Sequence, residues 1–113
     1  MRLERARTKR QPYVRSAYFN KDKVFIQPFW QHLWEKGNWR DRARRARFLP
    51  CALELLRHSR LVPRTQENPN DRNELLHRFY GVTEAGEHFV VQVSENKRTN
   101  RKNFMSVFPE HTP

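Results

Sequence analysis

The chain has 113 residues and a formal net charge of +11, with 23 lysine and arginine residues against 12 aspartate and glutamate residues. This length predicts one domain with one core, and it excludes an enzyme that needs separate cofactor and substrate domains. The sequence has no apolar run of transmembrane length, and its one cysteine, Cys51, excludes an internal disulfide and a zinc site built from cysteines.

The N-terminal residues predict an arm followed by a short strand. Residues 1–16 carry six basic side chains and one acidic one, Pro12 interrupts any helix there, and few residues before Tyr13 suit a core. We therefore expect a flexible basic arm over residues 1–16, and we assign residues 17–113 to one domain. Residues 24–26, which are β-branched or aromatic, predict a strand.

Three helices are predicted next, over residues 29–36, 39–48 and 49–58. Gly37 ends the first helix, and Asn38 is suited to cap the second. The second helix is rich in arginine. The third helix carries an apolar stripe that should pack on the core, formed by Leu49, Ala52, Leu53 and Leu56.

The C-terminal half predicts a loop and then three strands. Residues 59–73 are rich in proline, asparagine and other turn formers, which indicates a loop. The apolar pattern then changes to a period of two, and it predicts strands over residues 75–82, 88–94 and 104–108, with a hairpin turn at 83–87. We therefore expect an α+β domain in which N-terminal helices pack on a small antiparallel sheet, a meander at the C-terminus.

The basic residues gather in three segments: 1–16, 36–47 and 97–103. The first two segments each carry six basic residues and one acidic residue, and the third carries four basic residues and no acidic one. Such segregation predicts a polyanionic partner, whereas an anionic membrane is a weaker alternative because no basic segment has an apolar face rich in leucine or phenylalanine. We expect nucleic acid to be bound by Arg40, Arg42, Arg44, Arg45, Lys97, Arg98 and Arg101.

The motifs of common nucleases and hydrolases are absent from the sequence. There is no glycine-rich phosphate loop, no HExxH, no CxxC and no GxSxG, and the acidic residues are scattered rather than clustered as a two-metal nuclease requires. We therefore expect no metal and no cofactor. RNA is cleaved without metal when its 2′-hydroxyl attacks the neighbouring phosphate, and this reaction needs a base, an acid and cations.

Two histidines are candidates for the acid and the base. His32 lies between two tryptophans on the first predicted helix, and His77 alternates with apolar residues along a predicted strand. A structural role is the alternative for each, although a titratable group in an apolar row favours a function. The other histidines fall at a helix end, a hairpin edge and the C-terminal tail: His58, His88 and His111.

The last predicted strand and its flank add two polar candidates. Ser106 lies between Phe104 and Phe108 on one predicted strand face, where its hydroxyl could donate to a phosphate or bond to nearby backbone. Lys102, just before this strand, could reach the same phosphate or lie in solvent. The arginine helix has Asp41 as its one acid, so its cations repel one another until an anion binds.

These segments carry a resemblance to a known family. Residues 17–109 resemble the phage- and toxin-associated small nucleases of the barnase–EndoU–colicin–RelE-like (BECR) superfamily, through RARFLPCALELLRHSRLV, LLHRFYG, HFVVQVS and KNFMSVF. The resemblance implies helices packed on an antiparallel sheet and a metal-independent ribonuclease site on the sheet's concave face. It also implies a set of site residues, namely His32, Arg47, Lys102 and Ser106, with His77 as a further candidate.

Two functions of different classes follow. The first is a metal-independent endoribonuclease, for example a toxin that cleaves tRNA or mRNA to a 2′,3′-cyclic phosphate and meets a cognate acidic immunity or antitoxin protein. The second is a non-catalytic protein that holds nucleic-acid phosphates with its arm and arginine helix. A protein-interaction module anchored by exposed tryptophans is a third alternative. We expect a cytoplasmic protein, or a toxin domain delivered into a target cell.

Overall fold

The structure is a computed structural model that describes residues 11–35 and 38–110. A short hairpin comes first in this part of the chain. Its strands are β1 (Tyr13–Ser16) and β2 (Asp22–Phe25), which pair antiparallel and bury Val14 and Val24. Residues 13–16, which we assigned to a flexible arm, instead form β1 and pack on the core through Val14. Residues 1–10 lie outside the described residues.

Three helices follow: α2 (Gln27–Glu35), α3 (Trp39–Arg47) and α4 (Leu49–His58). They confirm the three predicted helices within a residue or two at each described end. The Asn38 side chain caps α3 as predicted, because its Oδ1 accepts a hydrogen bond from the backbone N–H of Asp41 at 2.9 Å. In α4, Ala52 and Leu56 are buried, and Leu49 and Leu53 pack against the core.

Four strands complete the chain: β3 (Arg64–Asn68), β4 (Asp71–Val82), β5 (His88–Asn96) and β6 (Lys102–Pro109). The hairpin turn between β4 and β5 confirms the prediction, with Gly86 at a positive φ of 88°. The prediction of a loop over residues 59–73 is partly wrong, because this range contains β3 and the start of β4. β3 was not visible as a strand because its RTQEN sequence is exposed and shows no apolar alternation.

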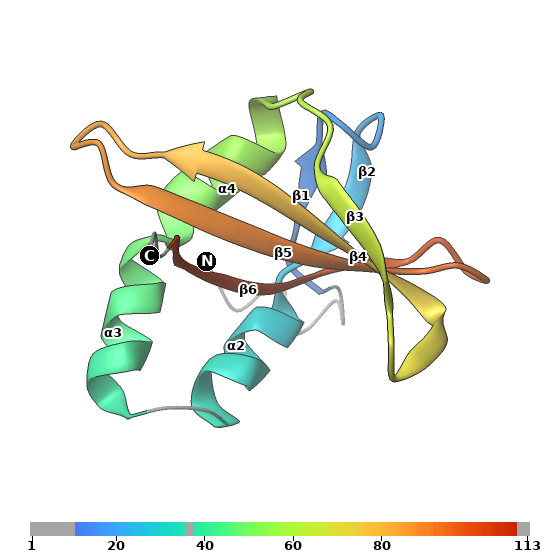
Figure 1. The fold of residues 1–113 in the computed structure, drawn as a ribbon, viewed down its shortest axis with the longest axis horizontal. Coiled ribbons are helices and arrows are strands. Elements are labelled where there is room, and N and C mark those ends of the chain that lie inside the picture. The colour runs from blue at the N-terminus through green and yellow to red at the C-terminus, as the bar shows by residue number, and fades with distance from the viewer. Residues whose placement is uncertain (1–10, 36–37, 111–113) are drawn as a thin grey trace.

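The strands form one six-stranded mixed sheet in the order β1-β2-β6-β5-β4-β3 (Figure 1). The predicted architecture of N-terminal helices on a small antiparallel meander is therefore wrong in three respects. Two strands precede the described helices, the sheet is twice as large as a three-stranded meander, and β2 pairs parallel with β6. The placement of all the described helices between β2 and β3 is still compatible with an α+β class.

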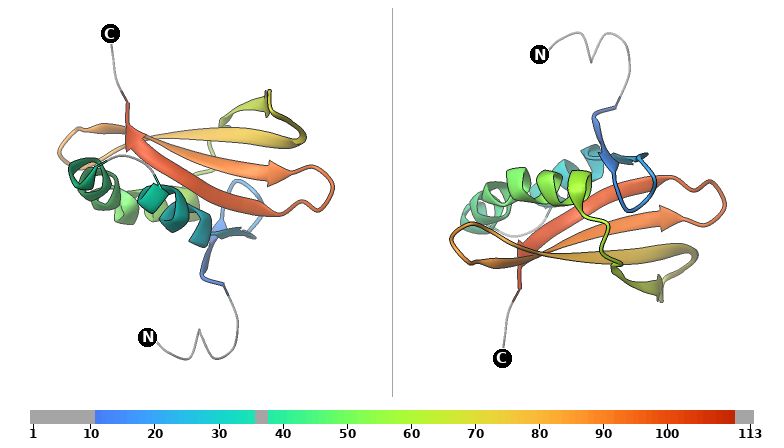
Figure 2. Two further views of the ribbon diagram at one scale, coloured as in Figure 1. Left: turned by 90° about the horizontal axis from the view of Figure 1, so that it is seen from below. Right: turned by 90° about the horizontal axis from the view of Figure 1, so that it is seen from above.

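The helices all lie on one side of the sheet, and the opposite face carries no described helix (Figure 2). The core lies between these layers. Its residues from β4, β5 and β6 are Phe79, Phe89, Val91, Val93, Phe104 and Val107, and β1 and β2 add Val14 and Val24. Phe29 of α2 stacks on Phe104 with a centroid distance of 4.9 Å, and Phe48 packs on Phe89 at 5.6 Å. These aromatic contacts fix the helices against β5 and β6, the strands that carry the candidate site.

Candidate functional site

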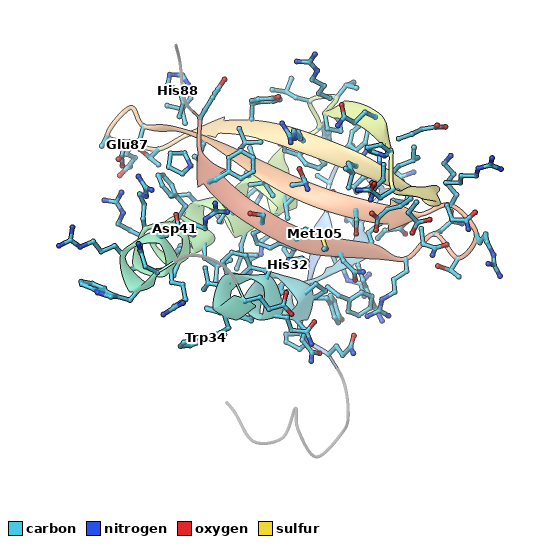
Figure 3. All side chains as sticks on the ribbon, turned by 60° about the horizontal axis from the view of Figure 1, so that its bottom comes forward. His32, Trp34, Asp41, Glu87, His88 and Met105 are labelled. Atoms are coloured by element: carbon cyan, nitrogen blue, oxygen red, sulfur yellow. The ribbon has the colours of Figure 1, made fainter. Side chains whose placement is uncertain are left out.

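The outer edge of β6 is where helices and sheet meet. β2 pairs with β6 only at Lys102 and Asn103, and α2 and α3 lie along the rest of this edge. A cavity of about 380 Å³ opens there. Figure 3 shows His32 of α2 beside Met105 of β6, at the place where this cavity lies. The cavity is lined by Phe29, His32, Leu33, Asp41, Arg45, Gln92, Met105, Ser106 and Phe108.

Three of the predicted site residues line this cavity together: His32, Arg45 and Ser106. Nη1 of Arg45 donates a hydrogen bond to Oγ of Ser106 at 2.8 Å, and Nε of Arg45 donates to Oδ2 of Asp41 at 2.9 Å. Because Oγ of Ser106 accepts from Arg45, the serine can still donate its own hydroxyl hydrogen. The cavity thus brings together an imidazole, a guanidinium, a hydroxyl and a carboxylate, which are groups that can bind and activate a phosphodiester.

Ser106 reaches the cavity because β6 contains a β-bulge. Gln92 of β5 pairs with Ser106, whereas its neighbour Val93 pairs with Phe104. Met105 is therefore the extra residue of the bulge, and it shifts the alternation of β6 by one position.

The bulge overturns one prediction about this strand. Phe104 and Val107 both face the core with 0% exposure, whereas Ser106 and Phe108 face the other side. The prediction that Phe104, Ser106 and Phe108 share one strand face is therefore wrong. Because of the bulge, Ser106 lies beside the arginine of α3 instead of between two phenylalanines.

A row of polar side chains crosses the face of the sheet opposite the helices. Arg64 of β3 pairs with Arg78 of β4, Arg78 pairs with Gln92 of β5, and Gln92 pairs with Ser106. Nε of Arg78 donates to Oε1 of Gln92 at 3.1 Å, and Arg45 extends the row beyond Ser106. We define the open face by the residues of this row and the row beside it: Arg64, Arg78, Tyr80, Val90, Gln92, Ser106 and Phe108.

Arg64, Arg78 and Gln92 were not among the candidate residues predicted from the sequence. A signal for Arg78 was present, because the alternation that directs His77 to the apolar side directs Arg78 to the opposite one. No such signal exists for Arg64, whose strand has no apolar alternation.

His77 and Lys102 lie in a second cluster, on the helix side of the sheet. His77 is 5% exposed, with Nε2 2.8 Å from Oε1 of Glu95 and Nδ1 2.7 Å from Oγ1 of Thr65. Lys102 is 4% exposed, and its Nζ lies 2.9 Å from Oδ2 of Asp22 and 3.7 Å from Oε2 of Glu95. These contacts explain both residues as members of one polar network within the fold.

The structure therefore does not join His32 and His77 in one site. His32 lines the cavity beside β6, and His77 is enclosed by Thr65, Glu95 and the ring of Phe19, whose centroid is 5.0 Å away. The two histidines are therefore separate candidates, one in each cluster, rather than members of one site.

Arg47 is separate from both clusters. It ends α3, and its Nη2 lies 3.6 Å from Oε2 of Glu87 in the turn between β4 and β5. Both side chains are half exposed or more. Arg47 thus belongs to the surface of α3 rather than to the cavity of Ser106.

The other arginines of α3 lie among exposed tryptophans. The guanidinium of Arg40 lies 5.8 Å from the ring centroid of Trp39, and that of Arg42 lies 5.0 Å from the ring centroid of Trp34. Trp34 and Trp39 are 70% and 67% exposed. Arg44 is exposed and pairs loosely with Asp41, at 3.5 Å.

The third basic segment lies at the other end of the sheet, in the turn between β5 and β6 (Figure 1). Lys97 pairs with Glu67 at 3.0 Å, the guanidinium of Arg101 lies 3.9 Å from the ring centroid of Phe25, and Arg98 is exposed. The seven predicted nucleic-acid contacts therefore form two separate patches rather than one.

Within residues 11–35 and 38–110, no three histidine, cysteine, aspartate or glutamate side chains are grouped so that they could hold a metal ion. No helix in these ranges is long and apolar enough to cross a membrane.

Comparison of the chain with family models, curated proteins and solved structures gave no match. The resemblance to the BECR nucleases therefore stays a prediction.

Proposed function

We propose that this protein binds RNA, with the arginines of α3 holding its phosphates. The observation that carries the proposal is the composition of α3 in its structural setting. The helix has five arginines against one aspartate, and it buries none of its residues. Its apolar contact with the core is partly buried Ala46, so core packing accounts for little of the helix. The mutual repulsion of its cations would be relieved by a polyanion.

The surroundings of α3 also suit RNA. Exposed Trp34 and Trp39 lie against Arg42 and Arg40, and unpaired bases can stack on such rings and guanidinium groups. The cavity next to α3 offers Arg45 and Ser106 as further phosphate ligands. RNA as the partner favours the cytoplasm as the compartment.

The salt dependence of RNA affinity tests this proposal. Arg40→Gln/Arg44→Gln should weaken binding to a short RNA strand and reduce the slope of log affinity against log salt by about 1 to 1.5, since each arginine on a single strand contributes about 0.7. The matched control is Arg57→Gln/Arg60→Gln, since Arg57 pairs with Glu54 at 3.7 Å across i,i+3 much as Arg44 pairs with Asp41. Equal slopes for the two variants would exclude α3 from the interface.

A second candidate function is metal-independent cleavage of the bound RNA, as in the BECR nucleases that the chain resembles. The observation that favours it is the shared cavity of His32, Asp41, Arg45 and Ser106. The 2′-hydroxyl would attack the adjacent phosphorus, and either His32 or Asp41 would take the proton of this hydroxyl. The 5′-oxygen would leave with a proton from the other, and Arg45 would stabilise the charged phosphorane. The products are a 2′,3′-cyclic phosphate and a 5′-hydroxyl.

Incubation of the protein with bulk RNA in excess EDTA tests this second function. Cleavage should yield 2′,3′-cyclic phosphate ends, and His32→Ala should slow it by about 10²–10⁴-fold while RNA binding is retained. His58→Ala, on an exposed helix end, is the matched control and should leave the rate unchanged. If cleavage is found, a toxin acting on tRNA or mRNA with an acidic immunity partner becomes the next hypothesis. If no RNA is cut, binding alone remains.

A further inference from the structure

We propose that the open face binds single-stranded RNA by stacking an unpaired base on Tyr80, while the arginine row beside it holds the backbone. This inference rests on the proposed RNA binding and extends it from the α3 surface to the sheet. It names unpaired RNA, rather than duplex RNA, as the substrate class.

Tyr80 lies on β4 and pairs with Val90 of β5, which in turn pairs with Phe108 of β6. Val90 is 3% exposed although no described helix covers this face (Figure 2), whereas Tyr80 is 42% exposed. An aromatic side chain is thus presented to solvent on a strand that is fixed on both sides by its neighbours.

Two arginines lie close to the ring of Phe108 on β6. The guanidinium groups of Arg45 and Arg78 lie 5.8 Å and 5.7 Å from the centroid of its ring. Each is also held by a hydrogen bond, Arg45 to Ser106 and Arg78 to Gln92. Phe108 therefore orients two arginines from different elements toward the same part of the open face.

The open face carries positive charge along one row of side chains. Arg64, Arg78 and Arg45 stand along one row that crosses four strands. Asp41 contacts this row through Arg45. Glu74 lies on the same side of β4, four residues from Arg78, and accepts a hydrogen bond from Asn68 at 2.6 Å, while Glu110 pairs with His88 at 4.0 Å. Cations along a line with an exposed aromatic ring beside them suit a strand whose phosphates follow the line and whose bases turn toward the ring.

Duplex RNA does not meet these requirements. Its bases are stacked on one another and paired, so a duplex offers the sheet phosphates and sugar hydroxyls but no free base face. An unpaired strand can use both Tyr80 and the arginine row. The open face should therefore discriminate between single and double strands. Because bases stacked on Trp34 and Trp39 would give the same preference, the effect of Tyr80→Ala assigns the discrimination to the open face.

The experiment measures affinity by fluorescence anisotropy for three labelled probes of one length. They are a single 2′-O-methyl RNA strand, the duplex of that strand, and an abasic strand that keeps the phosphates but has no bases. None of these has a free 2′-hydroxyl, so cleavage cannot remove the probe. Wild-type protein should bind the single strand more tightly than the other two.

Tyr80→Ala is the main variant. It should weaken binding of the single strand by about 5- to 100-fold, the range for loss of one base–aromatic stack, and leave binding of the abasic strand unchanged. Tyr80→Phe keeps the ring and should keep the affinity. Tyr13→Ala is the matched control, because Tyr13 is 39% exposed with Arg15 and Lys23 over its ring, but it lies on β1 at the sheet edge.

The outcomes separate this inference from the proposed function. If Tyr80→Ala leaves binding of the single strand unchanged, while Arg40→Gln/Arg44→Gln still flattens the salt slope, stacking on the open face is wrong and RNA binding by α3 stands. If Tyr80→Ala and Tyr13→Ala weaken single-strand binding alike, the effect is not that of the open face. If wild-type protein binds none of the probes, both proposals are overturned.

Discussion

The ring of His77 and the carboxylate of Glu95 are joined by a hydrogen bond of 2.8 Å between neighbouring strands β4 and β5. The other oxygen of this carboxylate lies 3.7 Å from the ammonium of Lys102, which Asp22 also contacts. The network therefore ties the start of β2, at Asp22, to β4, β5 and β6. His77 and Lys102, both predicted as catalytic residues, have a structural explanation in this network.

We expect Lys102→Ala to lower the free energy of unfolding by about 3 kcal/mol, because it removes a buried cation and leaves the Glu95 carboxylate without one of its partners. Lys97→Ala is the control. Lys97 makes a similar contact to Glu67 at 3.0 Å, but this pair is exposed, so its loss should cost less than about 1 kcal/mol. Urea denaturation measures both. Similar losses would show that burial does not distinguish the two ion pairs.

A second prediction concerns Gly81 of β4, which lies under the ring of Phe89. A Cβ at this position would lie 2.5 Å from Cζ of Phe89, and Phe89 is 2% exposed and packed on Phe48. We expect Gly81→Ala to destabilise the protein by about 1–3 kcal/mol, as measured by thermal or urea denaturation. The double variant Gly81→Ala/Phe89→Leu should lose less than the sum of its single variants.

Gly86→Ala is the control for Gly81→Ala, because its cost should come from the backbone and not from a contact with Phe89. Gly86 has open space around it but a positive φ of 88°, so its substitution should cost about 1–2 kcal/mol through backbone strain. Phe89→Leu should not change that cost. If Phe89→Leu restored part of the stability lost in Gly86→Ala, the cost at Gly86 would not be backbone strain alone.

The helices and the β4–β5 hairpin were predictable because each has a local signal. Asn38 before an arginine- and alanine-rich run predicts the start of α3, and residues 83–87 predict the hairpin turn. The pairing of β2 with β6 was not predictable in this way. It joins residues 24–25 with 102–103, and no property of either segment alone specifies a parallel partner so distant in sequence.

The candidate site was predicted in its residue types but not in its arrangement. His32 and Ser106 were both expected in one site, and the cavity contains both. Arg45 was expected only to bind nucleic acid, although it contacts Ser106 directly. That contact depends on the bulge at Met105, which the alternation of FMSVF does not reveal.

A third prediction links the cap of α3 to RNA binding. Asn38→Ala removes the hydrogen bond to the N–H of Asp41, which should cost α3 about 1 kcal/mol. Because α3 buries no residue, this loss should appear as local opening rather than as a lower global stability. Hydrogen exchange of the α3 amides should become faster, and RNA affinity should fall.

Asn38→Ser is the control, because serine can cap the helix in the same way. It should restore slow exchange and normal RNA affinity. A loss of RNA affinity in both variants, with hydrogen exchange accelerated only in Asn38→Ala, would mean that Asn38 contacts RNA itself.

The last prediction concerns Arg45 and Ser106, whose side chains are joined at 2.8 Å in the cavity beside β6. If both contact the same phosphate, the effects of Arg45→Gln and Ser106→Ala on RNA affinity should not add, with a coupling free energy of about 0.5–3 kcal/mol. Arg47→Gln is the matched control, because Arg47 carries the same charge on the same helix but pairs with Glu87 instead. Its effect and that of Ser106→Ala should add to within about 0.5 kcal/mol. Fluorescence anisotropy with a 2′-O-methyl strand measures the affinity of the three single variants and of the two double variants, Arg45→Gln/Ser106→Ala and Arg47→Gln/Ser106→Ala. Additive effects for Arg45 and Ser106 would mean that the two residues act on different phosphates or that only one of them contacts RNA.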